Sequence, residues 1–272
     1  MDARLQRRVQ RYGWDAAADK YESGWAACLN SAHDRLLELS ALRRDMSVLE
    51  LACGTGLVTL RIAAAVGPRG RVVATDISEV MVAATQRNAA AAGLSNVTTA
   101  HMEAEALIFA NGSFDVAVGA LGMMYVPDPQ LALSQMCRVV RSGGQVAATV
   151  WGERGKCGWA EIFPIVASVV ASEVCPLFFA TGVPGALIAD AEAAGMSGIV
   201  EQRDQVELRW RDERSLVMAM IDGGPVALAA KRFTPEIRSQ VESQFLASVA
   251  AFRRANGIYA IPGEFCTVAG HA

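Results

Sequence analysis

Short apolar segments alternate with longer segments of helical pattern through the first 152 residues. Five apolar runs are each too short for a buried helix and each stop at a polar or glycine residue, which predicts strands. They lie at 46–52, 71–76, 96–102, 113–121 and 145–152. Nearly continuous apolar strands between helices are typical of a parallel sheet that is covered on both faces. The pattern therefore predicts an α/β fold with right-handed crossovers.

Local signals mark where the intervening helices begin and end. The segment "LVTLRIAAAV" is predicted to be a helix closed by "GPRG". Ser78 is expected to cap the next helix, "EVMVAATQRNAAAA", and Gly93 to end it. The segment "QLALSQMCRVV" predicts a further helix that ends at "SGG", before the strand "QVAATVWG".

The pattern changes on either side of this core, which suggests three regions. Residues 1–45 are predicted to form an N-terminal helical lid, and 46–152 form the core. The remainder, 153–272, is expected to complete the sheet and to carry two insertions, at about 153–185 and 211–256. These insertions are predicted to form a lid over the carboxyl edge of the sheet, where open α/β folds bind ligands.

A glycine turn, "LELACGTGL" at 49–57, follows the first predicted strand. Gly54 and Gly56 match the start of a dinucleotide fingerprint, but Thr59 stands where its third glycine would be, so the match is weak. A carboxylate at Glu50 would repel a pyrophosphate by about 1 kcal/mol or more. S-adenosylmethionine suits Glu50 better, because it carries a sulfonium and an ammonium. Its carboxylate can lie at the N-terminus of the helix that follows Gly56.

Two further acids follow later predicted strands. Asp76 ends the second strand and is expected to accept the hydroxyls of a ribose, since Ser78 already suits the alternative role of helix cap. A ribose is present in both NAD and S-adenosylmethionine, so Asp76 does not choose between them. Glu103 follows the third strand, where its carboxylate can accept from an adenine amine or stand in water.

Composition excludes several classes of protein. Of the 272 residues, 52% are hydrophobic and the net charge is −3, which argues against a general nucleic-acid binder. The basic run of Arg4, Arg7, Arg8 and Arg11 has helical spacing and is interpreted as a solvated helix face. The mean hydropathy of +0.25 is compatible with an apolar substrate pocket or with an oligomer interface, such as that of a homodimer.

Other sequence signals bear on location and metal binding. The first residues are charged and lack the apolar segment of a signal peptide, so no signal peptide is expected. The most hydrophobic segment, 162–172, is shorter than the ~20 residues of a membrane span. A soluble, cytoplasmic protein with no membrane partner is expected. Six cysteines form no C-x-x-C pair, and neither they nor the acids have metal-site spacing, so no metal is predicted.

A series of motifs resembles one family. "VLELACGTG", "ATD", "MEAEAL" with "SFD", "YVPDP" and "RVVRSGGQVAATVWG" occur in the order seen in class I S-adenosylmethionine-dependent methyltransferases. The chain is similar to the branch that contains the ubiquinone and menaquinone enzymes and many natural-product enzymes. The resemblance covers about residues 46–152, and it departs at Ala52 and Cys53, where glycine and another small residue are common.

The resemblance implies a fold and a set of cofactor contacts. The fold would be a doubly wound, Rossmann-like, seven-stranded sheet of order 3-2-1-4-5-7-6, with the seventh strand antiparallel and helical lid insertions. Asp76 would bind the ribose, and Tyr21 would fold over the cofactor. The other implied contacts are Ala52, Gly54 and Gly56 at the methionine and ribose, Ile77 and Met81 on the adenine, Glu103 and Ala104 at its edge, and Gly119, Ala120 and Leu121 facing the sulfonium.

The methyl acceptor is expected to be a small, apolar or aromatic molecule. The segment after the fourth strand, "GALGMMYVPDP", lacks the Asn/Asp-Pro-Pro-aromatic motif of enzymes that methylate DNA bases. Tyr125 and, less favoured, His33 are the candidate catalytic residues. The candidate walls of an acceptor pocket are Trp151, Trp159, Phe163, Phe178 and Phe179.

Three other functions stay open at this point. An NAD-linked oxidoreductase is disfavoured by Thr59 and Glu50, whereas a non-catalytic module that binds S-adenosylmethionine would keep the same motifs. An arsenite methyltransferase would require three thiolates, for which Cys157, Cys175 and Cys266 are the candidates. Cysteine is more commonly a small core residue, so this last alternative is the least favoured.

Overall fold

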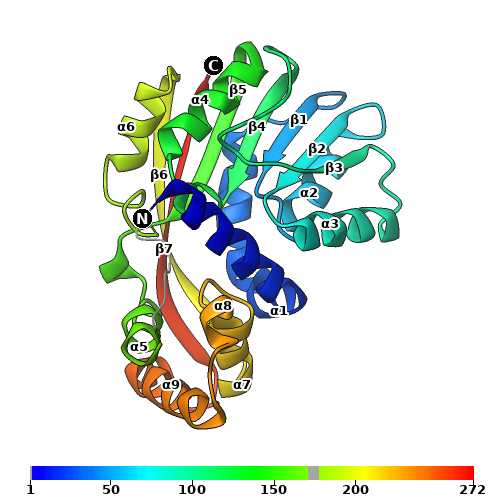
Figure 1. Cartoon of the computed structure of the whole chain (residues 1–272). Helices are drawn as coiled ribbons and strands as arrows, with labels where there is room; N and C mark the ends of the chain where they lie inside the picture. The colour runs from blue at the N-terminus through cyan, green and yellow to red at the C-terminus, as the bar shows by residue number, and fades with distance from the viewer. Residues whose placement is uncertain (1, 171–177) are drawn as a thin grey trace.

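The structure is a computed structural model, and it describes residues 2–170 and 178–272. A seven-stranded sheet of order β3-β2-β1-β4-β5-β7-β6 organises the chain (Figure 1). Its strands are β1 (Ser47–Leu51), β2 (Arg71–Asp76), β3 (Val97–His101), β4 (Phe114–Ala120), β5 (Val140–Trp151), β6 (Ser197–Trp210) and β7 (Tyr259–His271). The first five are parallel, and β7 runs antiparallel to both β5 and β6. The expected strand order and the antiparallel seventh strand are confirmed.

Helices cover both faces of this sheet. On one face, α4 (Pro129–Val139) packs on β4 and β5, and α6 (Ala186–Ala193) packs on β6 and β7; the core on this face includes Leu49 and Leu51. On the other face, α2 (Leu57–Val66) and the end of α1 (Ala3–Leu39) pack on Val48 and its neighbours. The alternation of Val48 and Leu49 between two cores follows from the two-residue period of a strand. The helix α3 (Glu79–Ala91) lies along β2 and β3.

The local signals for helix ends hold in most places. Ser78 caps α3, as expected, by accepting from the backbone N–H of Met81. In the structure, Thr234 also caps a helix, α9 (Pro235–Ser248), by accepting from the backbone N–H of Ile237. The expected helix end at "SGG" is wrong, because α4 ends at Val139 and β5 already begins at Val140. The glycines instead lie inside β5, where its pairing with β4 shifts register between Phe114 and Val116.

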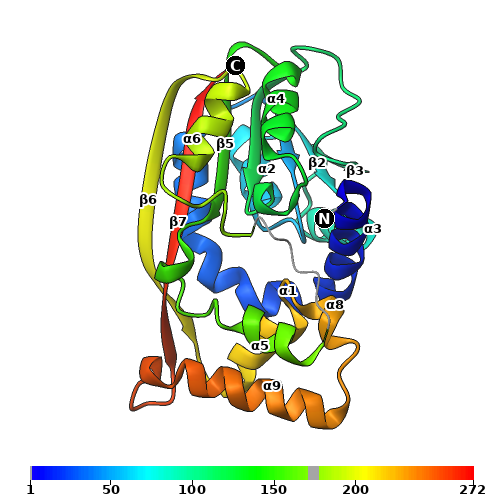
Figure 2. The same ribbon diagram turned by 60° about the vertical axis from the view of Figure 1, so that its left-hand side comes forward.

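A group of helices forms a second layer below the carboxyl edge of the sheet (Figures 1 and 2). The long strands β6 and β7 run down to it, and α1 crosses between the sheet and this layer. Its elements are α5 (Ile162–Val169), α7 (Glu213–Val217), the π-helix η3 (Met218–Asp222), α8 (Ala227–Ala230) and α9. All of them lie within the two insertions for which a lid role was predicted, and that role stays a prediction.

Candidate cofactor and acceptor site

The glycine turn after β1 has a backbone shape that few side chains tolerate. Ala52, Gly54 and Gly56 have φ values of 54°, 56° and 93°, all in the left-handed region that favours glycine. A Cβ on Gly56 would also stand 3.2 Å from atoms of Thr85 on α3. The turn therefore brings the start of α2 close to β2 and α3, and it leaves the backbone N–H groups of that helix end facing the carboxyl edge of the sheet.

Asp76 at the end of β2 is bound to this turn. Its carboxylate accepts from the backbone N–H of Gly54 and from that of Ser78, each over 2.9 Å. The residue is 6% exposed, and burial raises its pKa to about 6 although these hydrogen bonds oppose the shift. Each carboxylate oxygen has a second acceptor position, so Asp76 can still accept hydrogen bonds from a ligand.

A cavity of about 770 Å³, measured up to and including its open mouth, lies beside Asp76. Most of the residues predicted to contact the cofactor line it. They are Tyr21, Ala52, Gly54, Asp76, Ile77, Met81, Glu103, Ala104, Ala120 and Leu121, together with the catalytic candidate Tyr125. These residues come from five separate segments, and the sheet topology brings them together because β1, β2, β3 and β4 all end at this edge.

Three of the predicted cofactor residues do not line the cavity. Glu50 is 1% exposed and lies on the α2 face of the sheet, where its carboxylate accepts from the Thr59 hydroxyl over 2.5 Å. Burial raises its pKa to about 8, with a further contribution from Asp76. Gly56 forms part of the turn without lining the cavity. Gly119 lies one residue before the lining residue Ala120, and a Cβ on Gly119 would stand 3.1 Å from Met123.

His33 lies in the buried part of α1, away from the residues that line the cavity. Burial lowers its pKa to about 4, and nearby Arg61 lowers it further while Asp34 opposes the shift. A buried, neutral histidine that does not line the cavity is not placed to contact a ligand bound there. The geometry therefore favours Tyr125 over His33 as the residue near a methyl acceptor.

The sequence predicted a helical lid at 1–45, but it did not single out the residues in the first turns of α1 that line the cavity. Arg7 forms ion pairs with Glu105 over 2.9 Å and with Glu103 over 3.2 Å, and both Gln10 and Trp14 line the cavity beside it. The interpretation of the arginine run as a solvated face is wrong for Arg7, whose side chain is only 25% exposed. No local pattern points to a partner 98 residues away, although the three- and four-residue spacing of these side chains already places them on one helix face.

A second, smaller cavity of about 320 Å³ shares part of its wall with the first. The shared residues are Trp14, Tyr21, Leu121 and Tyr125. The rest of its wall consists of Trp25, Leu29, Met124, Trp151, Trp159, Phe178, Gly224 and Pro225. None of these described residues carries a charge, so the second cavity is an apolar, aromatic space that adjoins the first.

The predicted acceptor walls divide into two groups around this cavity. Trp151, Trp159 and Phe178 line it directly. Phe163 and Phe179 pack behind them, with ring centroids 5.8 Å from that of Trp159 in both cases. The aromatic residues of the segment after β5 therefore form one cluster, in which edge-to-face contacts predominate, and that cluster fixes the shape of the wall.

The cysteines named as possible arsenic ligands are not assembled in the described part of the chain. Cys157 and Cys266 are both buried, and neither lines the two cavities, while Cys175 lies outside the described residues. Within residues 2–170 and 178–272, no group of three His, Cys, Asp or Glu residues is placed to hold a metal ion. The same residues include no helix that is both long and apolar enough to cross a membrane.

Comparison with known proteins identifies the core. Residues 48–144 match the family model described as "Methyltransferase domain". This part of the chain is therefore similar to methyltransferase domains. Among curated proteins, the chain is similar to a demethylmenaquinone methyltransferase of Shouchella clausii, with 39% identity over 100 residues that cover 37% of this chain and 43% of that protein. The chain spans about half the length of the first such relatives it matches.

Two further likenesses extend beyond the methyltransferase domain. A nocamycin O-methyltransferase of Saccharothrix syringae is 28% identical over 218 residues, which cover 75% of this chain and 78% of that protein. The structure of a phosphoethanolamine N-methyltransferase of Haemonchus contortus in complex with S-adenosyl-L-methionine has a TM-score of 0.60 at 16% identity, covering 94% of this chain and 57% of that one. The resemblance to class I S-adenosylmethionine-dependent methyltransferases and the Rossmann-like fold expected from it are therefore confirmed.

Proposed function

We propose that the protein is an S-adenosylmethionine-dependent methyltransferase that acts on a small, uncharged, apolar or aromatic molecule. The observation that carries this proposal is the pair of adjoining cavities. One is polar at Asp76 and lies at the glycine turn of the methyltransferase domain, and the other is aromatic and lined by no charged residue among those described. A transferase needs two such sites side by side, whereas a module that only binds the cofactor needs one.

The first cavity suits an adenosyl cofactor in size and chemistry. Its volume lies within the roughly 300–1,000 Å³ of small-molecule sites. Asp76 would accept ribose hydroxyls, and Ile77 and Met81 would pack on the adenine. The start of α2 does not line the cavity but lies next to the lining residue Gly54, and its backbone N–H groups would hold the carboxylate. Glu50 lies behind this turn and does not line the cavity, so we propose that it supports the turn through its hydrogen bond with Thr59 and makes no contact with the ligand.

The residues around the junction of the cavities would align the two reactants. When bound, the cofactor supplies an electrophilic methyl group on its sulfonium. Trp14 and Tyr21 of α1 stand in both walls and would exclude water from the junction, which is most of what this displacement requires of an enzyme. Tyr125 stands there as well, and we propose that its side chain contacts the reacting group of the acceptor.

The acceptor class follows from the second cavity. A charged molecule would lose its hydration there without gaining an opposite charge from the described wall, which costs several kcal/mol or more. A flat apolar or aromatic molecule would instead gain contact with indole and phenyl rings. The names of the relatives, a demethylmenaquinone methyltransferase and a nocamycin O-methyltransferase, also favour a small-molecule acceptor.

Ligand-induced stabilisation tests this proposal. S-adenosylhomocysteine at 100 times its Kd should stabilise the protein by about 2.7 kcal/mol, a Tm rise of roughly 5–10 °C, whereas NAD should give none. Transfer of labelled methyl from S-adenosylmethionine to a panel of hydroxylated and unsubstituted aromatic molecules then tests turnover. Stabilisation by NAD alone would overturn the assignment of S-adenosylmethionine as the cofactor. Binding of S-adenosylhomocysteine without methyl transfer to any acceptor would favour the non-catalytic module.

A further inference from the structure

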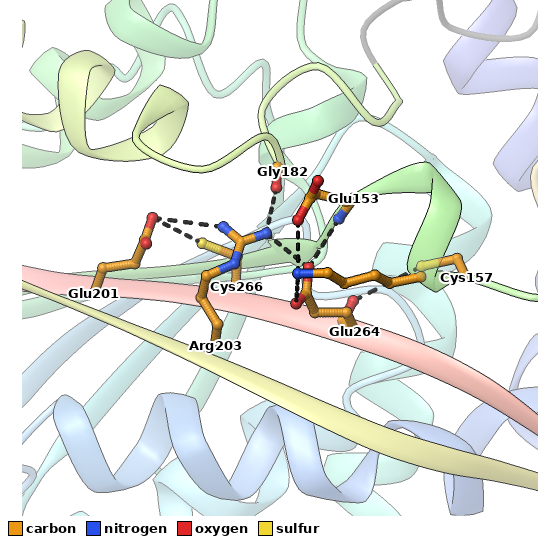
Figure 3. Close-up of polar contacts among 8 residues, drawn as sticks. Glu153, Cys157, Gly182, Glu201, Arg203, Glu264 and Cys266 are labelled. Atoms are coloured by element: carbon orange, nitrogen blue, oxygen red, sulfur yellow. Dashed lines mark hydrogen bonds and ion pairs between the residues drawn. The ribbon is translucent and has the colours of Figure 1, made fainter.

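A buried carboxylate lies outside both cavities, next to the point where the chain leaves β5 and enters the segment that carries Trp159. Glu264 on β7 is 1% exposed. One of its oxygens accepts from Lys156 Nζ over 2.9 Å. The other accepts from Arg203 Nη2 over 2.7 Å and from the backbone N–H of Glu153 over 3.0 Å (Figure 3). Two cations and one amide thus converge on a single carboxylate inside the protein.

These contacts join the two ends of one segment of the chain. Glu153 and Lys156 lie where the chain leaves β5, and the carbonyl of Gly182, where the segment returns, accepts from Arg203 Nη2 over 2.6 Å (Figure 3). The ends are packed so tightly that a Cβ on Gly182 would overlap the backbone of the chain leaving β5. The described parts of 153–182 are therefore fastened at both ends to the β6–β7 pair.

The fastened segment contributes part of the aromatic wall. Trp159 lies a few residues after Lys156 in the chain. Its ring centroid lies 4.8 Å from that of Trp151 at the end of β5. Phe178 precedes Gly182, and its centroid lies 5.7 Å from that of Trp159. Because both residues line the aromatic cavity, the shape of that cavity depends on where the ends of the segment are held.

The charge balance shows why the anchor depends on an ionised carboxyl. Burial by itself raises the pKa of Glu264, but the hydrogen bonds from Arg203, Lys156 and Glu153 outweigh it and hold the pKa below its ordinary value. Arg203 is mostly buried, and its Nε has no hydrogen-bond partner among the described residues. Loss of the carboxylate charge would leave a buried guanidinium without its main counterion, which is far more costly than loss of a surface pair.

We propose that Glu264 is a positioning residue for the methyl acceptor: it fastens both ends of 153–182 and thereby sets Trp159 and Phe178 at the spacing that admits a flat aromatic molecule. This inference rests on the proposed function, because it concerns the acceptor cavity of that enzyme. It assigns Glu264 no contact with either ligand. Its removal should therefore alter acceptor binding and leave cofactor binding unchanged.

The matched control is Asp115, a carboxylate that also accepts from an arginine and from a backbone amide. Asp115 lies near the start of β4 and accepts from Arg141 over 2.8 Å and from the backbone N–H of Ser47 over 2.9 Å. It lines neither cavity. The variants Glu264→Gln and Asp115→Asn each remove one carboxylate charge and retain its shape, and Lys156→Met is a milder change at the same anchor should Glu264→Gln fold poorly.

The test measures the two ligands separately, with S-adenosylhomocysteine for the cofactor cavity and 2-naphthol, an uncharged planar probe, for the aromatic cavity. In Glu264→Gln, we expect the Kd of 2-naphthol to rise about tenfold or more, because a displaced wall loses contact with the ring, while the Kd of S-adenosylhomocysteine stays within about twofold. Asp115→Asn should change neither. Lys156→Met should also raise the Kd of 2-naphthol, but by a smaller factor than Glu264→Gln.

Hydrogen exchange gives a readout that needs no ligand. Amides of 153–170 should exchange faster in Glu264→Gln than in wild type, and amides of β1 and β4 should not. Unchanged exchange in 153–170, or parallel losses of probe and cofactor affinity, would overturn the positioning role. Failure of wild type to bind S-adenosylhomocysteine would overturn the proposed function instead, and failure of wild type to bind 2-naphthol would overturn the aromatic acceptor site together with this role.

Discussion

The backbone N–H of Gly54 donates a hydrogen bond to the carboxylate of Asp76 over 2.9 Å. This contact joins the turn after β1 to the end of β2, so the two strongest sequence signals for a cofactor belong to one unit. Each residue satisfies a need of the other: Asp76 provides an acceptor for the backbone N–H of Gly54, and that N–H provides a donor for the buried carboxylate of Asp76. A change at either residue should therefore affect both the fold of the turn and the binding of the cofactor.

Replacing Asp76 by asparagine should weaken cofactor binding. A carboxylate that accepts from ribose hydroxyls contributes about 1.5–3 kcal/mol, so the Kd of S-adenosylhomocysteine should rise roughly 10- to 150-fold. Isothermal titration calorimetry on Asp76→Asn and on wild type measures the change. Equal affinities for the two proteins would remove Asp76 from the site.

The pH dependence of binding should report the same carboxyl group. Burial raises the pKa of Asp76 to about 6, and the ionised form is the one that can accept from two hydroxyls while it also holds the Gly54 and Ser78 amides. Affinity for S-adenosylhomocysteine should therefore increase as the pH rises through about 6, and below that value it should fall by up to about tenfold per pH unit. The profile should be flat in Asp76→Asn, and a flat wild-type profile between pH 5 and 7 contradicts the assignment.

Glu50→Gln should stabilise the protein at alkaline pH. The folded protein raises the pKa of Glu50 to about 8, from an ordinary value of 4.5, mainly through burial. Between these values the folded state binds more protons than the unfolded state, so wild-type stability falls as the pH rises through this window, by up to about 1.4 kcal/mol per pH unit. A glutamine keeps the acceptor for Thr59 and carries no charge.

Urea unfolding at pH 5 and pH 8, without ligand, compares the two proteins. The stability difference between Glu50→Gln and wild type should be larger at pH 8 than at pH 5. Asp115→Asn is the opposite control: hydrogen bonds from Arg141 and Ser47 outweigh its burial and lower the pKa of Asp115, so its stabilising effect is present at neutral pH and is lost in acid. Equal differences at both pH values would contradict the buried placement of Glu50.

How far the sequence could predict this site is illustrated by Glu50 and Arg7. The strands, the turn, the position of Asp76 at the end of β2 and the cap at Ser78 each depend on residues close together in the chain, and the structure has them where they were expected, apart from the start of β5. The alternation of β1 already places position 50 on the same face as Val48, but only the fold shows that this face is covered by α2. Arg7 could not be assigned, because its carboxylate partners become neighbours only when α1 crosses the sheet edge.

Gly122→Ala should destabilise the junction of the two cavities, and Ala52→Gly should compensate. A Cβ on Gly122 would overlap the Cβ of Ala52, which itself has a left-handed backbone conformation that favours glycine. Crowding of this kind costs about 1–3 kcal/mol, and removal of the opposing methyl group should return most of it in the double variant. Thermal unfolding of the two single variants and the double variant measures the coupling. Strictly additive effects would show that these residues do not meet.

Arg7→Met should loosen the start of α1 over the cofactor cavity. Arg7 pairs with Glu105, whose side chain is 4% exposed and whose other oxygen accepts from the backbone N–H of Asp128 over 3.0 Å. Loss of Arg7 leaves that carboxylate with one donor fewer in a buried position, which should cost about 1–3 kcal/mol of unfolding free energy. S-adenosylhomocysteine should also dissociate more quickly, because Gln10 and Trp14 on the same helix close the cavity.

Stopped-flow dissociation of S-adenosylhomocysteine, with Arg8→Met as the control, separates this contact from a general effect of charge. Arg8 is the adjacent, exposed arginine of the same helix, so its replacement removes the same charge without touching Glu105. Arg7→Met and Glu105→Gln should not be additive, since either change alone breaks the one ion pair. Equal dissociation rates in Arg7→Met and Arg8→Met, or fully additive losses in the double variant, would mean that α1 is held over the cofactor cavity by its apolar packing and not by this pair.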